Sequence, residues 1–329
     1  MKSFEHELSL ISHAATRAAR LCVAVRQQMI AADAMEKAGR EPVTIADYGS
    51  QAIILQMIAA NFPNDQVFAE ERAVDFRNAA SESQREAVTR FVSQTLESSI
   101  SQEDIAIWLD FGRDRRSNRV WAIDPIDGTK GFLRGEQFAI AIALIVDGKP
   151  AVSALACPML PYEPDEFVAV QGVLATAIRG QGATLQPLDG SASRPLRVST
   201  RTRGSEARVV ESVESGHSDH GFSASVLAAA GIIGQPVRMD SQAKYVAVAD
   251  GRADLYIRHS VGEGYAEKIW DHAAGVLIVE EAGGRVTDLN GAMLDFSQGE
   301  RLSANHGILA ANDRLHGPAL TAVRQTQRG

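Results

Sequence analysis

The sequence predicts a mixed α/β protein (α+β), in which an antiparallel-sheet domain is followed by a smaller α/β domain. In the first half, two apolar runs at 138–146 and 151–156 flank an Asp-Gly pair, a pattern typical of antiparallel strands joined by a tight turn. In the second half, short apolar runs alternate with helix-length segments, which is typical of an α/β layer. A segment rich in Ser, Gly and Pro at 187–195 lies between the two patterns. We therefore expect domains at 1–190 and 191–329.

Each element of the first half follows from the spacing of its apolar residues. Helical spacing predicts a first helix to about residue 35, a second from Asp47 to about residue 61, and one or two surface helices within 76–100. Apolar runs predict strands at 67–69, 120–123, 138–146, 151–156, 167–170 and 175–179.

The second half is predicted in the same way. Strands are expected at 208–211, 236–239, 253–257 and 307–311. Helices are expected at 222–230, 243–249 and 271–282, and paired glycines end the last of these.

Composition excludes several classes of protein. The net charge is −8, so no basic excess favours a nucleic acid polymer, and an anionic substrate needs local cations or metal ions. No run of eighteen apolar residues predicts a membrane span. Two isolated cysteines, Cys22 and Cys157, give neither a disulfide framework nor zinc spacing and fit a reducing cytoplasm. We expect a monomer or a weak homo-oligomer.

The stretch WAIDPIDGTKGFLRG, residues 121–135, carries the clearest chemical signal. A strand ends on Asp124 and Asp127, and hard cations such as Mg²⁺ take carboxylate oxygens while leaving room for water and phosphate. Pro125 stiffens the turn, and Gly128 allows the backbone to approach an anion closely. A bare Asp-x-x-Asp-Gly is more often an ordinary turn, so the acids elsewhere in the chain have to be considered with it.

Three further acids occupy positions that allow the same chemistry. Asp47 and Asp271 stand near predicted helix starts, where helix capping is the ordinary role of a carboxylate. Glu70 ends the short strand at 67–69. Carboxylates gathered at one point would raise each other's pKa strongly unless cations lie between them.

The complete motifs identify a resemblance that single residues do not. The string at 121–135 resembles the signature of the metal-dependent, lithium-sensitive phosphatase superfamily, which includes inositol monophosphatases, fructose-1,6-bisphosphatases and 3'(2'),5'-bisphosphate nucleotidases. The segments SVESGHS at 212–218, DSQAKY at 240–245 and EKIWDHAAG at 267–275 resemble the nucleotidases of fungi and plants. The resemblance extends over nearly the whole chain.

This resemblance implies a layered αβαβα sugar-phosphatase fold and a set of site residues. Two or three Mg²⁺ ions are implied, with these ligands: Glu70, Asp124, the carbonyl of Ile126, Asp127 and Asp271. The implied catalytic pair is Asp47 and Thr129, in which the hydroxyl contacts the attacking water and the carboxylate accepts its proton. The implied substrate-binding residues are Gly128, Thr129, Glu214, His217, Ser241, Lys244, Arg258 and Asp271.

The implied reaction is hydrolysis of the 3'-phosphate of adenosine 3',5'-bisphosphate to AMP and phosphate, with 3'-phosphoadenylyl sulfate as a further substrate. A role in sulfur metabolism and inhibition by Li⁺ follow from the same resemblance. Two alternatives stay open: an inositol phosphate phosphatase of the same superfamily, and a nucleotide-binding sensor without catalysis. Arg72 departs from the family pattern, which has Ser or Asp there; its charge either weakens a loosely held ion near Glu70 or points to solvent.

Overall fold

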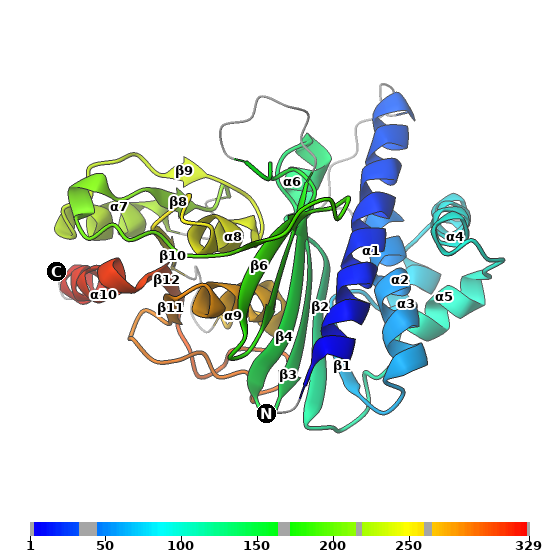
Figure 1. Cartoon of the computed structure of the whole chain (residues 1–329). Helices are drawn as coiled ribbons and strands as arrows, with labels where there is room; N and C mark the ends of the chain where they lie inside the picture. The colour runs from blue at the N-terminus through cyan, green and yellow to red at the C-terminus, as the bar shows by residue number, and fades with distance from the viewer. Residues whose placement is uncertain (1–2, 33–44, 164–171, 215–218, 260–264, 328–329) are drawn as a thin grey trace.

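The computed structural model describes residues 3–32, 45–163, 172–214, 219–259 and 265–327. In these residues the chain forms alternating layers of helices and sheets (Figure 1). The layers are α1 (Glu5–Ala32) and α2 (Ile45–Asn61), a seven-stranded sheet, α8 (Ala243–Ala249) and α9 (Ala273–Glu281), a five-stranded sheet, and α7 (His220–Ala229) and α10 (Asp313–Thr326). The predicted fold class, a layered αβαβα arrangement, is confirmed.

The first sheet is antiparallel except at one edge, where β1 runs parallel to β2. Its strands lie in chain order: β1 (Gln66–Ala69), β2 (Arg119–Asp127), β3 (Ala139–Val146), β4 (Lys149–Cys157), β5 (Val173–Ile178), β6 (Gly182–Pro187) and β7 (Arg194–Pro195). Strands β3 and β5 are apolar and buried almost throughout, because helices cover both faces of the sheet.

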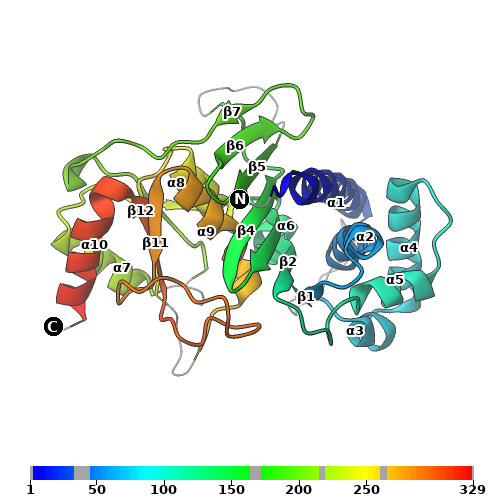
Figure 2. The same cartoon turned by 60° about the horizontal axis from the view of Figure 1, so that its bottom comes forward.

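The second sheet mixes parallel and antiparallel pairs. Its order is β11 (Gly284–Thr287), β12 (Ile308–Asn312), β10 (Leu255–Arg258), β8 (Val209–Glu211) and β9 (Val237–Arg238). Helix α9 contacts β4 of the first sheet and β11 of the second, and Figure 2 shows it between them. The two sheets therefore pack against the same apolar layer, which fixes their position relative to each other.

Shorter helices complete the fold. Three of them lie beside α2 on the outer side: α3 (Ala73–Asn78), α4 (Glu82–Leu96) and α5 (Gln102–Leu109). Reciprocal capping boxes begin α4 at Ser81 and α5 at Ser101. The short helix α6 (Thr129–Arg134) follows β2, and the 3₁₀ turns η1 (Gly204–Glu206) and η2 (Ile269–Asp271) precede β8 and α9.

Most predicted elements are present, and the differences have local causes. The segment after Asp127, interpreted as a turn, forms α6, because Gly128 adopts a left-handed conformation that begins a helix. Helix α10 was not predicted because Pro318 interrupts its pattern, although its buried residues Leu315, Ala319 and Val323 have helical spacing. The elements α5, β6 and β11 were also not predicted.

The predicted strand at 167–170 and the predicted end of the first helix at residue 35 lie outside the described residues. The division into domains at residue 190 stays a prediction. No helix in the described ranges is long and apolar enough to cross a bilayer.

The packing of α9 gives a direct test of the shared layer. A Cβ added to Gly275 would lie 2.3 Å from Cδ2 of the buried Tyr245 ring, whereas one added to Gly49 of α2 would meet a movable Leu21 methyl group at 3.0 Å. We expect Gly275→Ala to lower the free energy of unfolding by about 1–3 kcal/mol. We expect Gly49→Ala to change it by less than about 1 kcal/mol, because helix propensity offsets the contact. Denaturant titration measures both, and equal losses would contradict this packing.

Candidate active site

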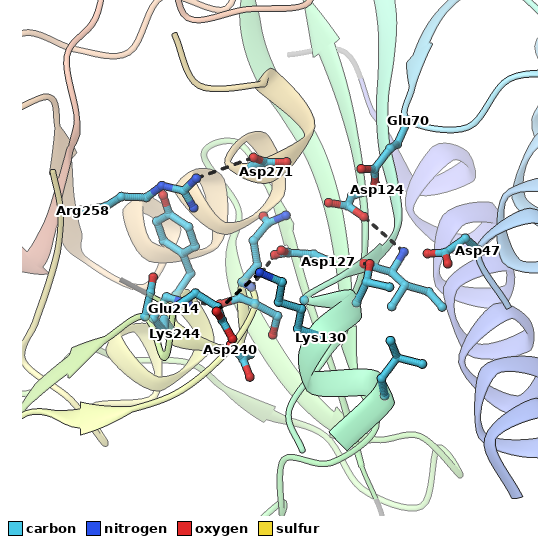
Figure 3. Close-up of a pocket in the computed structure, with 18 of the residues that line it drawn as sticks. Asp47, Glu70, Asp124, Asp127, Lys130, Glu214, Asp240, Lys244, Arg258 and Asp271 are labelled. Atoms are coloured by element: carbon cyan, nitrogen blue, oxygen red, sulfur yellow. Dashed lines mark hydrogen bonds and ion pairs between the residues drawn. The ribbon is translucent and has the colours of Figure 1, made fainter. Parts of the chain in front are cut away.

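A pocket of about 290 Å³ opens where the end of β2, helix α6, the 240–242 turn and the η2 turn meet. Figure 3 shows Glu70, Asp124, Asp127 and Asp271 around its upper part, with Asp47 at one side. The described site residues that the sequence predicted all line it: Asp47, Glu70, Asp124, Ile126, Asp127, Gly128, Thr129, Glu214, Ser241, Lys244, Arg258 and Asp271. His217 lies outside the described residues.

A bulge in β2 brings Asp124 and Asp127 to one face of the sheet. Residues three apart in a regular strand point to opposite faces. Here Asp124 pairs with Ala141 and Asp127 with Ala139, so three steps along β2 correspond to two along β3. The extra residue in β2 restores the alternation, and Pro125 fits the bulge because it has no N–H to donate.

Glu70 is placed by the parallel register of β1. Ala69 pairs with Ile123, so the next residue of each strand, Glu70 and Asp124, lie side by side at the sheet edge. The Gln51 side chain of α2 holds the following residue, donating to the Glu71 carbonyl at 2.8 Å and accepting from the Glu71 N–H at 2.9 Å. Glu71, which was not predicted, is buried and also lines the pocket.

Arg72 stands where the family pattern has Ser or Asp. Its side chain is exposed and does not line the pocket, so its charge points to solvent rather than toward an ion at Glu70.

The predicted catalytic pair lies at the same edge. Asp47 is buried in the first turn of α2, and Ser50 one turn on donates to the Pro125 carbonyl at 2.9 Å, which ties α2 to the bulge. The Thr129 hydroxyl donates to the Ile126 carbonyl at 3.1 Å. Both side chains therefore reach the pocket beside the acids of β2.

The electrostatics of the acids fit divalent cations. Burial raises the pKa of Asp124 well above its usual range, and the Glu70, Asp127 and Asp271 charges raise it further. Burial also raises the pKa of Asp271, although the Arg258 guanidinium opposes this. Glu70 reaches solvent, yet the protein around it and the charges of neighbouring acids raise its pKa to about 7. Carboxylate and carbonyl oxygens crowded in this way are a donor set that hard cations stabilise.

Gln242 connects the site across the two sheets. Its backbone N–H donates to Asp127 Oδ2 at 2.5 Å, and its Nε2 donates to the Trp270 carbonyl at 2.9 Å. Its Oε1 accepts from the Gly275 N–H at 3.1 Å. The sequence pointed to DSQAKY for Ser241 and Lys244 but did not assign a role to this glutamine. The residues that Gln242 contacts are distant in the sequence, so the residues next to it in the chain did not indicate its role.

Lys244 and Ser241 line the pocket on the side of the second sheet, where the neighbouring Gln242 N–H reaches Asp127. The Lys244 ammonium group is buried and donates to the carbonyls of Met239 at 3.0 Å and Ser241 at 2.7 Å, which fix the turn. Burial lowers the pKa of Lys244 to about 8. Ser241 has a φ of 66°, a left-handed backbone conformation that residues other than glycine adopt uncommonly.

Ion pairs across the pocket rim involve Glu214. Lys130 Nζ lies 3.5 Å and Arg134 Nη1 lies 2.8 Å from its carboxylate, and Arg134 Nη2 donates to Asp240 at 2.6 Å. These pairs join α6 to the loops of the second sheet. Lys130, Arg134 and Asp240 were not predicted; the string TKGFLRG contained the two cations, but their partners lie about 80 to 106 residues away.

Comparison with known proteins identifies the family. A model of the inositol monophosphatase family matches residues 6–328. The chain belongs to the inositol monophosphatase family. This confirms the resemblance predicted from the motifs, and the members of this family use divalent metal ions.

Relatives of known name cover almost the whole chain. A protein of Emericella nidulans named 3'(2'),5'-bisphosphate nucleotidase is 40% identical over 98% of this chain and 99% of its own length. One of Oryza sativa with the same name is 40% identical over 97% and 93%. The solved structure of an inositol monophosphatase from Anabaena covers 98% of this chain and 97% of its own, with a TM-score of 0.65 and 23% identity, which supports the fold.

The raised pKa values predict how stability depends on pH and metal. Glu70 and Glu71 have ordinary pKa values of 4.5 that rise to about 7 and about 9 in the folded chain. Their stabilising contribution is therefore complete below pH 4.5 and is lost as the pH rises through 7 and 9. Without metal, we expect the melting temperature to fall between pH 5 and pH 8. MgCl₂ should raise it more at pH 8 than at pH 5, because cations bind the ionised acids.

Thermal denaturation in EDTA and in MgCl₂ checks this dependence. Asp124→Asn should flatten the pH profile and lose the Mg²⁺ increment, whereas Glu206→Gln, an exposed acid in η1, should keep both. A metal-free melting temperature that rises over this pH range would contradict the crowding of acids.

Proposed function

We propose that the chain hydrolyses the 3'-phosphate of adenosine 3',5'-bisphosphate to AMP and phosphate, with 3'-phosphoadenylyl sulfate as a further substrate. The observation that carries this proposal is the unequal charge of the pocket walls. The acids of the first sheet that suit divalent cations lie on one side of the pocket, and the cations Lys244 and Arg258 lie on the other, beside Asp271, which is 3.9 Å from Arg258 Nη2. A substrate with two phosphates matches both walls, whereas inositol monophosphate has no group for the second.

The names of the relatives support the same substrate. The proteins of Emericella nidulans and Oryza sativa are named for the bisphosphate nucleotides, and the aligned regions include the wall that carries Lys244 and Arg258. The site would hold two or three Mg²⁺ ions on Glu70, Asp124, the Ile126 carbonyl, Asp127 and Asp271. When bound, they would polarise the phosphoryl oxygens and make water more acidic.

The chain's own residues would orient the reactants and move the proton. The Thr129 hydroxyl, beside the Ile126 carbonyl, would contact the attacking water, and the Asp47 carboxylate would accept its proton through that hydroxyl. Gly128 and Ser241 lie against each other, so the turn that presents Thr129 and the wall that carries Lys244 are fixed together. The site would lie within one chain, which would be a monomer or a weak homo-oligomer, and no macromolecular partner would be required.

A substrate panel tests this function. Phosphate release would be measured from adenosine 3',5'-bisphosphate, inositol 1-phosphate and fructose 1,6-bisphosphate, first with MgCl₂ and then with EDTA. We expect the nucleotide to have a kcat/KM at least about tenfold above inositol 1-phosphate, since inositol 1-phosphate has no group for the second wall. EDTA should abolish release.

The other outcomes distinguish the alternatives. A preference for inositol 1-phosphate would favour the inositol phosphatase. Binding of the nucleotide without release of phosphate from any substrate would favour a sensor.

The catalytic pair makes a second prediction. Asp47→Asn and Thr129→Ala should each lower kcat by about 10²–10⁴-fold while KM changes little, because each removes proton transfer without removing a phosphate contact. Steady-state kinetics in MgCl₂ measures both constants. Thr321→Ala, which removes an exposed hydroxyl of α10, is the matched control and should behave like the wild type. Near-normal kcat in both pocket variants would rule out this pair.

A further inference from the structure

Arg258, at the end of β10, is held in place by a buried carboxylate. Its Nε donates to Glu267 Oε1 at 2.9 Å, and its Nη2 lies 2.7 Å from Glu267 Oε2. The same Nη2 is 3.9 Å from Asp271 Oδ2 at the pocket. The Arg258 side chain is 11% exposed and that of Glu267 is 3% exposed. Arg258 also lines the pocket, so the guanidinium that Glu267 holds is part of the pocket surface.

A second layer of side chains holds Glu267. His272 Nε2 lies 3.4 Å from Glu267 Oε2, and the Tyr245 hydroxyl lies 2.8 Å from His272 Nδ1. Glu267 accepts two hydrogen bonds from Arg258 and is therefore an acceptor for His272 as well. Nε2 then carries the ring hydrogen, and Nδ1 accepts from the Tyr245 hydroxyl. The order of contacts is Tyr245, His272, Glu267 and Arg258, and all four side chains are buried or nearly so.

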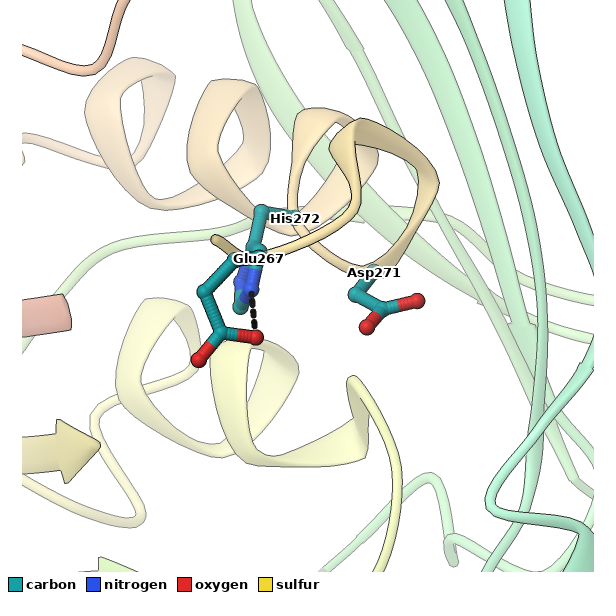
Figure 4. Close-up of side chains that lie close together, drawn as sticks. All are labelled: Glu267, Asp271 and His272. Carbon is teal, nitrogen blue, oxygen red and sulfur yellow. Dashed lines mark hydrogen bonds and ion pairs between the residues drawn. The ribbon is translucent and has the colours of Figure 1, made fainter. Parts of the chain in front are cut away.

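The grouping of Glu267, Asp271 and His272 looks at first like a metal site. Their potential ligand atoms lie within 4.8 Å of one another, and Figure 4 shows the contact between Glu267 and His272. Both Glu267 oxygens, however, are already bound by the guanidinium of Arg258, which neutralises the charge that a cation would need. The cluster is arranged to hold an arginine.

We propose that Glu267, supported by His272 and Tyr245, is a positioning residue that fixes the Arg258 guanidinium at the pocket and thereby sets the preference for a substrate with a second phosphate. The inference rests on the proposed function. An unsupported arginine has many rotamers, and ordering it on binding costs affinity; a guanidinium already held by a carboxylate avoids that cost. The motif EKIWDHAAG thus contains a metal-ligand candidate, Asp271, and the support of the opposite wall.

The test compares two substrates that differ by one phosphate. KM and kcat would be measured for adenosine 3',5'-bisphosphate and adenosine 3'-monophosphate. In Glu267→Gln, we expect KM for the bisphosphate to rise at least about tenfold, the change expected when a charge-assisted hydrogen bond is lost. Its kcat should stay within about twofold, because the reacting phosphate is bound elsewhere. The constants for the monophosphate should change little.

Two further variants separate positioning from stability. Asp250, whose side chain is 3% exposed, forms a comparable bidentate pair with Arg194 at 2.5 and 3.0 Å but does not line the pocket. Asp250→Asn should lower the melting temperature and leave the substrate preference unchanged. Tyr245→Phe removes only the last hydroxyl of the series, and it should shift the preference in the same direction as Glu267→Gln but less; it decides the question if Glu267→Gln does not fold.

A double-variant cycle completes the design. Arg258→Gln and the double variant Arg258→Gln/Glu267→Gln should show the same reduced preference, because Glu267 acts through Arg258. A wild-type preference in Glu267→Gln, or an equal loss in Asp250→Asn, would overturn the inference. A wild-type chain that does not prefer the bisphosphate would instead overturn the proposed function, and the inference with it.

Discussion

The mutual repulsion of acids gathered at one point is the constraint on which the site depends. The bulge in β2 turns Asp124 and Asp127 to one face, the parallel register of β1 sets Glu70 beside them, and the η2 turn brings Asp271 from the other sheet. Acids this close are stable together when they are protonated or when cations lie between them. The ions that relieve this repulsion are also those that the proposed reaction requires, so stability and chemistry are linked through the same carboxylates.

Holding the site together requires contacts between segments that are far apart in the chain. Gln242 binds Asp127, the Trp270 carbonyl and the start of α9 at once. Glycine at 275 lets α9 approach the Tyr245 ring, which in turn reaches His272. Loosening any of these contacts would separate the acids of the first sheet from Asp271. The shared apolar layer is therefore part of the active-site geometry as well as of the core.

What the sequence could predict depended on how local each feature is. Asp124, Asp127 and Glu70 stand at strand ends, and hydrophobic patterning finds strand ends. Gln242 could not be assigned a role, because its contacts are set by packing between residues 28 to 115 positions apart. Glu267 could not be assigned one because its contact with Arg258, nine residues away, does not lie within one helix or strand. The motifs nevertheless contained both residues, so a family resemblance carried information that propensity and spacing did not.

The pKa shifts on the two walls of the pocket have opposite directions. On the acid wall, burial and the charges of neighbouring acids raise the pKa values of Glu70 and Asp124. On the other wall, burial lowers the pKa of Lys244 to about 8, although two backbone carbonyls bind its ammonium group. A phosphate dianion placed beside Lys244 would favour its charged form, so binding and protonation are coupled there. In the proposed function, the acid wall selects for phosphate chemistry in general, and selection between substrates then depends on the wall that Lys244 and Arg258 form.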